Sequence, residues 1–106
     1  MITKKGKRKL LLPFDDLLME QLQDKAVAVE YLKDALANDG MPGYLEALRQ
    51  VAESRGGIGR LAVRTKLTRQ ALYKILSRGG NPTMSNVLGI SKILGVTFEP
   101  VFLKAA

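Results

Sequence analysis

The apolar residues between Ile58 and Ser77 recur at the spacing of two short helices joined by a tight turn. Thr68 is suited to cap the second of these helices, because its hydroxyl can accept a hydrogen bond from a backbone N–H of the first turn. The residues that such a pair would bury are Leu61, Ala62, Leu67, Leu72, Ile75 and Leu76. This spacing predicts a helix-turn-helix, and a chain of 106 residues has room for only one domain around it.

Burying those residues leaves a polar edge near the start of the second helix, formed by Arg69, Gln70, Tyr73 and Lys74. The recognition helix of a DNA-binding protein presents its base-reading side chains at this end. Arginine can make a bidentate contact with guanine and glutamine with adenine, while Thr68 can contact a phosphate. The alternative is an ordinary helical hairpin whose basic side chains are only solvated surface.

The net charge of +7 is distributed unevenly along the chain. Residues 54–98, which contain the predicted helix-turn-helix, carry eight basic residues and no acidic one. Residues 13–53 carry three basic and nine acidic residues, a net charge of −6, and residues 1–12 carry five basic residues and no acidic one. A basic, acid-free segment is what contact with a phosphate backbone requires, so the charge favours DNA binding over the ordinary hairpin.

The chain contains no cysteine and no histidine. Disulfides, thiolate and imidazole catalysis and the usual zinc sites are therefore excluded, although a metal site built from carboxylates alone is not. Adjacent Asp15 and Asp16 could suggest such a site, but neighbours do not face one another on a helix, and Asp is favoured at a helix start. We expect a protein that is not an enzyme and that binds no cofactor or metal.

The longest apolar run, Leu10–Phe14, has five residues. It is too short for a membrane span or for the core of a signal peptide. Because the absence of cysteine also fits a reducing compartment, we expect a cytoplasmic protein that has no membrane partner.

Turn and capping residues divide the rest of the chain into further helices. We expect helices over about 15–22, 24–38, 42–55 and 83–95, besides the two of the helix-turn-helix. Phe14, Leu36 and Met84 are expected in the core, and Gly89 at a closely packed position. The glycines of Gly56-Gly57-Ile58-Gly59 are expected to end a helix, because the run lacks the context of a phosphate-binding loop.

The C-terminal residues 96–103 alternate in polarity before Pro100 and predict a short strand at an edge, either as a dimer seam or folded back on the core. The predicted fold class is therefore all-α. It is a compact helical bundle of about five to six helices that contains a helix-turn-helix, with a short C-terminal strand.

Several longer motifs resemble one known family. They are Leu72-Tyr73-Lys74-Ile75-Leu76-Ser77 with Gly80-Asn81-Pro82-Thr83, and, further upstream, Pro13-Phe14-Asp15, Glu30-Tyr31-Leu32 and Arg55-Gly56-Gly57-Ile58. Over residues 13–98 the chain is similar to the small HigA-like antitoxins, also described as addiction module antidote proteins, which carry a Cro/CI-type helix-turn-helix.

This resemblance implies a type II antitoxin that neutralises a RelE/ParE-like toxin and represses its own operon by sequence-specific binding to operator DNA as a homodimer. The DNA contacts that it implies are Thr68, Arg69, Gln70, Tyr73 and Lys74, with Ser77 near the backbone. Residues 1–12 would be a basic flexible arm, 13–40 a candidate toxin-binding segment, 41–98 the DNA-binding domain and 99–106 a tail that could form a dimer strand. The arm could equally add phosphate contacts or act only as a solubilising tail.

The sequence departs from the family pattern at two places. Lys66 occupies a turn position where glycine is usual, and it would have to adopt a positive φ. Ile58-Gly59 stands where relatives of the wider repressor family often carry a phosphate-binding glutamine, so Arg60 or Arg64 would have to contact the phosphates. An antitoxin that inhibits its toxin but has lost operator binding therefore stays an alternative.

The acidic segment provides a candidate surface for the toxin. RelE-like toxins act on RNA and are usually basic, so this segment could face the toxin while the basic segment faces DNA. The carboxylates concerned are Asp15, Asp16, Glu20, Asp24, Glu30 and Asp34. A solvated helix face is the plain alternative for these acids, and a stand-alone Cro/CI-like repressor without a toxin partner is the alternative function.

Overall fold

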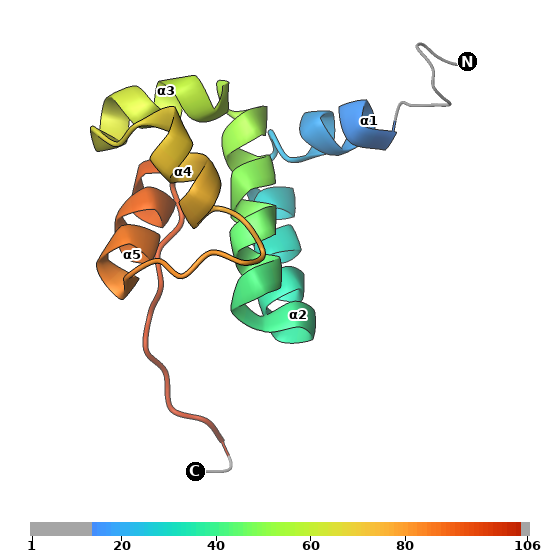
Figure 1. Cartoon of the computed structure of the whole chain (residues 1–106). Coiled ribbons are helices and arrows are strands. Elements are labelled where there is room, and N and C mark those ends of the chain that lie inside the picture. The colour runs from blue at the N-terminus through green and yellow to red at the C-terminus, as the bar shows by residue number, and fades with distance from the viewer. Residues whose placement is uncertain (1–13, 105–106) are drawn as a thin grey trace.

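The computed structural model describes the backbone of residues 14–104 and the side chains of residues 16–104. This part of the chain contains five α-helices and no strand (Figure 1). The helices are α1 (Phe14–Gln21), α2 (Lys25–Ser54), α3 (Gly57–Thr65), α4 (Arg69–Ile75) and α5 (Met84–Ile93). The predicted all-α class is confirmed. The basic arm and the side chain of Phe14, expected to anchor the core, lie outside the described residues.

Helix α2 consists of two limbs that meet at Gly40, whose φ of 67° and ψ of −156° are not helical. We call residues 25–39 the first limb and residues 41–54 the second limb. The chain turns back at Gly40, so the limbs lie side by side (Figure 1), and Tyr31 Oη donates a hydrogen bond across them to Gln50 Oε1. Only glycine adopts such dihedral angles at low cost. The helix break predicted at Asn38-Asp39-Gly40 is therefore confirmed.

The predicted N-caps form hydrogen bonds that satisfy the first turns of three helices. Asp24 Oδ1 accepts from the Ala26 N–H at 2.9 Å, Thr68 Oγ1 from the Ala71 N–H at 3.0 Å, and Thr83 Oγ1 from the Asn86 N–H at 3.1 Å. Each bond provides an acceptor for an N–H group that has no partner within its own helix. The starts of α2, α4 and α5 therefore lie where the capping residues predict them.

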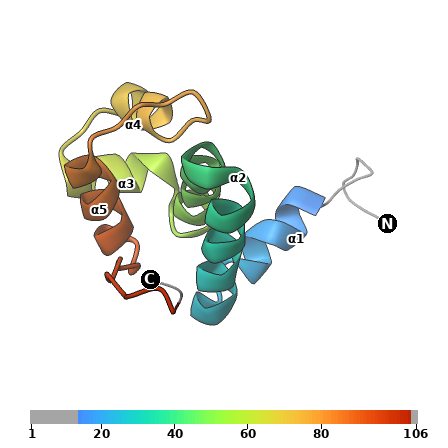
Figure 2. The ribbon, with the colours of Figure 1, turned by 90° about the horizontal axis from the view of Figure 1, so that it is seen from below.

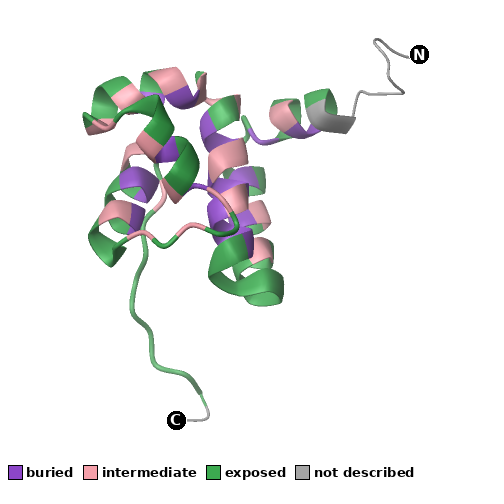
Figure 3. Ribbon diagram, in the orientation of Figure 1, coloured by how far each residue is buried: buried purple, intermediate pink, exposed green. Residues whose placement is uncertain are grey.

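The hydrophobic core surrounds the second limb of α2. Leu45, Leu48 and Val51 are almost completely buried, and they belong to one cluster with Leu72 in α4 and Leu76 at its end. Figure 3 shows buried residues along this limb and on the sides of α4 and α5 that face inward. Because α3 contacts α2, α4 and α5, it connects the helix-turn-helix to the rest of the core.

Three packing predictions were wrong. Leu36 is 40% exposed and Met84 is 64% exposed. Leu36 lies in the last turns of the first limb and Met84 is the first residue of α5, so the apolar stripes of both helices extend past the elements that cover them. Apart from its chain neighbours and the backbone of its own helix, nothing lies within 4 Å of the position that a Cβ on Gly89 would occupy, so this glycine is not closely packed.

The predicted C-terminal strand does not form in the described part of the chain. Gly95, with a φ of 91°, ends α5, and the Val96 N–H donates back to the Ser91 carbonyl at 2.8 Å. Phe98 packs edge to face on Tyr44, with ring centroids 5.3 Å apart. The residues after Phe98 are exposed up to residue 104, and the tail leaves the helices (Figure 1). A strand needs a neighbouring strand to bond with, and the described helices offer none.

Candidate nucleic-acid interface

The predicted helix-turn-helix is formed by α3, a tight turn and α4. Thr65 Oγ1 accepts a hydrogen bond from the Leu67 N–H at 3.2 Å inside the turn, and Thr68 caps α4. Leu67 is half-buried and packs against the core cluster, as its place in the turn predicts. The turn before α4 is therefore fixed by hydrogen bonds at Thr65 and Thr68 and by the packing of Leu67.

Lys66 adopts the left-handed conformation predicted for it, with a φ of 63° and a ψ of 21°. It is the one residue other than glycine with a positive φ among residues 14–104. Its backbone N–H donates to the Ala62 carbonyl at 2.9 Å and closes the last turn of α3. The turn therefore forms without glycine, at a cost of about 1–2 kcal/mol of backbone strain.

Helix α4 presents the predicted polar edge to solvent. Leu72 and Leu76 are fully buried, while Arg69, Gln70 and Lys74 are exposed and Tyr73 is 51% exposed. Figure 3 shows this exposed surface along α4. The arrangement can place an arginine, a glutamine, a phenol and a lysine in a major groove.

The guanidinium of Arg69 lies over the start of α3. A Cβ added to Gly59 would lie only 2.6 Å from Arg69 Nη2. Ile58 is buried and Gly59 has no side chain, so neither offers a side-chain ligand to a phosphate. Arg69 therefore brings a side-chain donor to the start of α3, where Ile58 and Gly59 bring none.

Arg60 and Arg64 lie on a different flank of α3 from Gly59, because successive residues of a helix point about 100° apart. They line a cavity of about 410 Å³ together with Arg55, residues 93–95 at the end of α5 and part of the loop before α2. The structure therefore brings Arg60 and Arg64 together with each other and with Arg55. It does not bring them to the polar edge of α4.

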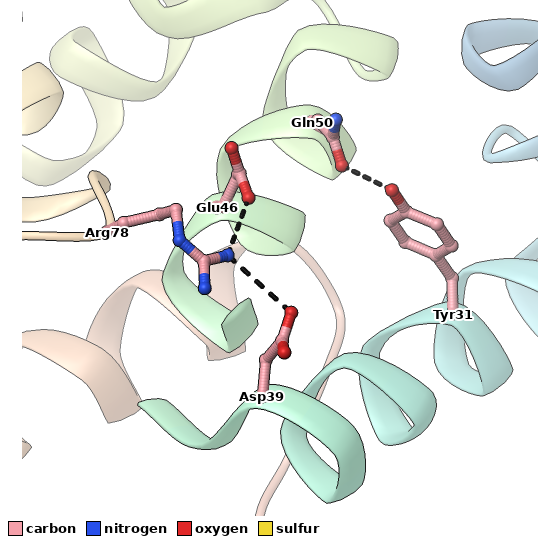
Figure 4. Close-up of polar contacts among 5 residues, drawn as sticks. All are labelled: Tyr31, Asp39, Glu46, Gln50 and Arg78. Carbon is pink, nitrogen blue, oxygen red and sulfur yellow. Dashed lines mark hydrogen bonds and ion pairs between the residues drawn. The ribbon is translucent and has the colours of Figure 1, made fainter. Parts of the chain in front are cut away.

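Arg78 and Ser77, which follow α4, are turned toward the protein. Arg78 Nη1 donates to Glu46 Oε1 at 3.0 Å and lies 3.6 Å from Asp39 Oδ2 (Figure 4). The hydrogen bond to Glu46, with the nearby charge of Asp39, raises the pKa of Arg78. Ser77 Oγ donates to the Lys74 carbonyl at 2.9 Å. Arg78 belongs to the acid-free segment 54–98, and no local pattern in the sequence indicates its partners 32 and 39 residues earlier.

The acidic residues predicted to face a toxin lie on α1, the loop that follows it and the first limb of α2. Asp16, Glu20 and Asp34 are exposed, Asp24 caps α2, and Glu30 pairs with Lys33 at 3.5 Å. The side chain of Asp15 lies outside the described residues. These acids lie on two helices and a loop, and we call the surface that they occupy the acidic face.

A hollow of about 410 Å³ lies between the two limbs of α2. Asp34, Asp39 and Glu46 line it together with Tyr31 and Gln50, and Figure 4 shows four of these side chains with Arg78. Burial, and then the charge of Glu46, raise the pKa of Tyr31. Asp39 and Glu46 join this acidic surface although the sequence pattern did not indicate them. Asp39 lies on the same limb as Asp34, whereas Glu46 lies on the second limb and reaches the hollow because α2 turns back at Gly40.

In residues 14–104 no group of three or more His, Cys, Asp or Glu side chains could hold a metal ion. No helix among the same residues combines the length and apolar content needed to cross a membrane.

Comparison with known proteins identifies one family. A family model with the description "Probable addiction module antidote protein" matches residues 11–102. A protein of Haemophilus influenzae described as "Uncharacterized protein" is 33% identical over 91 residues, which cover 77% of this chain and 93% of the relative. No solved structure matches the chain at a significant level. The match covers all five helices, and we conclude that the chain belongs to the family of probable addiction module antidote proteins.

Proposed function

We propose that this antidote protein neutralises a RelE/ParE-like toxin and represses its own operon by sequence-specific binding to operator DNA as a homodimer. Membership of an antidote family implies a toxin as partner. The DNA-binding half of the proposal depends mainly on one observation, which is the polar edge of α4. Arg69, Gln70, Tyr73 and Lys74 are exposed on a capped helix within a segment that contains no acidic residue.

The residues of the edge have separate roles in this proposal. Arg69 and Gln70 read base edges in the major groove, with Tyr73 and Lys74 beside them. Thr68 contacts the phosphate backbone, Ser77 lies near it, and Arg60 and Arg64 add phosphate contacts from α3. The α4 backbone is anchored by Leu72 and Leu76, so the edge enters the groove without rearrangement.

Binding to the chain's own promoter tests the DNA-binding half. Fluorescence anisotropy with a duplex from the region upstream of the gene, compared with a shuffled duplex, should give a difference in affinity of about 10³-fold or more. The logarithm of the binding constant should fall linearly with the logarithm of the salt concentration. Equal affinity for both duplexes at every salt concentration would reject operator recognition.

The toxin-binding half assigns the acidic face of α1 and the first limb of α2 to a basic toxin. The supporting observation is the placement of charge, since Asp16, Glu20 and Asp34 are exposed on α1 and on the first limb of α2. Figure 2 shows α1 and α4 on separate sides of the molecule, as Figure 1 does. Toxin and operator could therefore be bound together, with complementary charge on each face.

Neutralising these acids tests the toxin-binding half. A Glu20→Gln/Asp34→Asn protein, mixed with the product of the neighbouring gene, should bind more slowly and with a weaker dependence on salt. Glu99→Gln removes a negative charge outside the acidic face and serves as the matched control. Unchanged affinity and salt dependence in the double variant would refute the assignment.

The homodimer is proposed to form through the C-terminal tail. Val101, Phe102 and Leu103 are among the most exposed apolar residues in the described part of the chain. Solvent-exposed apolar side chains in an extended segment are suited to pairing with a second copy. A palindromic operator would then be read by two copies of α4 related by the dimer axis.

A further inference from the structure

Three arginines line one cavity beside the helix-turn-helix. Arg55 follows α2, while Arg60 and Arg64 lie one turn apart on α3, and all three border the cavity of about 410 Å³ described above. A smaller hollow of about 10 Å³ has the same three arginines in its wall. None of the described residues that line either space is acidic. The cavity therefore concentrates positive charge without an internal counterion.

Arg55 is held in place but is left with an unsatisfied donor. Its Nη2 donates to the Leu22 carbonyl at 3.2 Å and to the Gln23 carbonyl at 3.5 Å, which fixes the guanidinium against the loop before α2. Its Nε is buried and has no hydrogen-bond partner among the described residues. A buried charged donor without an acceptor is unfavourable, and a ligand in the cavity would add acceptors for the other N–H groups of this guanidinium.

Arg60 is directed toward the cavity by the glycine before α3. A Cβ on Gly56 would lie 2.6 Å from Arg60 Cδ, so the arginine stem occupies the space that a larger residue would fill. Gly56 is also the N-cap of α3, with a φ of 105°, and it supplies no side-chain hydrogen bond to the helix. The positive end of α3 therefore adds to the charge of the arginines.

We propose that Arg55, Arg60 and Arg64 form a binding site for a phosphoryl group. Guanidinium groups match phosphate oxygens in a bidentate way, and a phosphate has enough oxygens to accept from several of them at once. A carboxylate has only two oxygens and would satisfy the three guanidinium groups less completely. The site shares Arg60 and Arg64 with the proposed operator contacts, and it goes beyond them because it is concave and includes Arg55.

The phosphoryl group can come from two sources, which are the operator backbone and a small phosphate-bearing molecule. The first experiment contains neither DNA nor toxin, so its result is independent of the proposed function. Inorganic phosphate is titrated into the ¹⁵N-labelled protein, with chloride adjusted to keep the ionic strength constant. The amide resonances of Gly56, Gly57 and Arg60 should shift, and the shifts should saturate together.

Two variants test the assignment. Arg60→Ala/Arg64→Ala should weaken phosphate binding about tenfold or more, because each lost guanidinium removes charge-assisted hydrogen bonds. Lys92→Ala removes a positive charge that does not line the cavity, and it should change the affinity by less than about twofold. Arg55→Lys keeps the charge but lacks the planar fork, so its affinity should lie between those of the parent and the double variant.

Three results would contradict the proposed phosphoryl-binding site. They are phosphate shifts scattered over the surface, an equal loss of affinity in the Lys92→Ala and double variants, and binding of succinate as tight as that of phosphate. The last result would indicate a carboxylate from a protein partner.

Competition with a duplex identifies the source. If phosphate at constant ionic strength displaces the operator from the parent but not from the double variant, the operator backbone occupies the site. If the operator is not displaced while phosphate still saturates the site, the ligand is a small phosphate-bearing molecule. Either result supports the proposal, and the titration remains interpretable even if the protein binds no operator.

Discussion

Tyr44 Oη and Ser91 Oγ lie 2.9 Å apart in the core and join the second limb of α2 to α5. Both residues are at most 2% exposed. Phe98 packs on the Tyr44 ring, so the same residue also holds the first part of the C-terminal tail. This pair is a polar contact between elements that are otherwise joined by apolar packing.

Removing the Tyr44 hydroxyl should destabilise the protein. In Tyr44→Phe the buried Ser91 hydroxyl loses its partner, and we expect the free energy of unfolding to fall by about 1–3 kcal/mol in urea denaturation. Tyr44→Phe/Ser91→Ala removes both polar groups and should recover part of this loss. A double variant less stable than Tyr44→Phe would contradict this explanation.

The same tyrosine predicts a loss of stability in alkali. Burial raises the pKa of Tyr44 above its ordinary value of 10.0, although its hydrogen bond with Ser91 opposes the shift. The unfolded chain therefore loses the phenol proton first, so stability is fully present below about pH 10 and falls as the pH rises above it. Tyr44→Phe should show a smaller decline across this range in urea titrations.

Replacing Lys66 with glycine should stabilise the protein. Lys66 has a φ of 63°, and glycine removes the strain of this conformation at the expense of some additional chain entropy in the unfolded state. We expect a net gain of about 0.5–1 kcal/mol in the free energy of unfolding. Lys74→Gly, within α4, should instead cost about 1 kcal/mol. A destabilised Lys66→Gly protein would show that the lysine side chain stabilises the turn.

Base recognition should depend on Arg69 and Gln70. Replacing either with alanine should cost about 1–3 kcal/mol of operator affinity and relax preference at one or two base positions. Replacing Arg60 or Arg64 should weaken binding to all sequences and lower the salt slope by about one. Anisotropy on a set of singly substituted operators separates these effects. An Arg69→Ala protein that discriminates as well as the parent would exclude base reading by Arg69.

The ion pair between Arg78 and Glu46 should slow local opening of the loop after α4. The Gly80 N–H donates to the Ser77 carbonyl at 3.0 Å in this loop, so its hydrogen exchange should accelerate in Arg78→Ala. The unfolding midpoint should change little, because the pair is largely exposed. The swap Arg78→Glu/Glu46→Arg should restore slow exchange, unless the loop is ordered independently of the pair.

The tail should control self-association. Phe102→Asp should weaken the proposed dimer without altering the circular dichroism of the monomer, because this side chain is 99% exposed. Sedimentation velocity over a range of concentrations measures the effect. Val63→Asp places the same charge on an exposed apolar site of α3 and should leave the dimer intact. Identical association in Phe102→Asp and the parent would move the dimer contact elsewhere.

The local features of the fold could be predicted from the sequence, because each depends on neighbours within a few residues. Asp24, Thr68 and Thr83 cap their helices, Gly40 breaks α2, and Lys66 adopts a positive φ, all as predicted. Helical spacing also identified the exposed edge of α4. These predictions succeed because each involves hydrogen bonds or side-chain positions within about one helical turn.

Contacts between side chains of different helices could not be predicted from the sequence, because they depend on how the helices pack. Arg78 reaches Glu46 and Asp39 because α2 turns back at Gly40, and Arg55 joins Arg60 and Arg64 because α3 packs across the end of α2. The tail forms no strand within the described chain, since no neighbouring strand is available to it. Such contacts depend on the relative placement of whole helices, and periodicity along one helix carries no information about that placement.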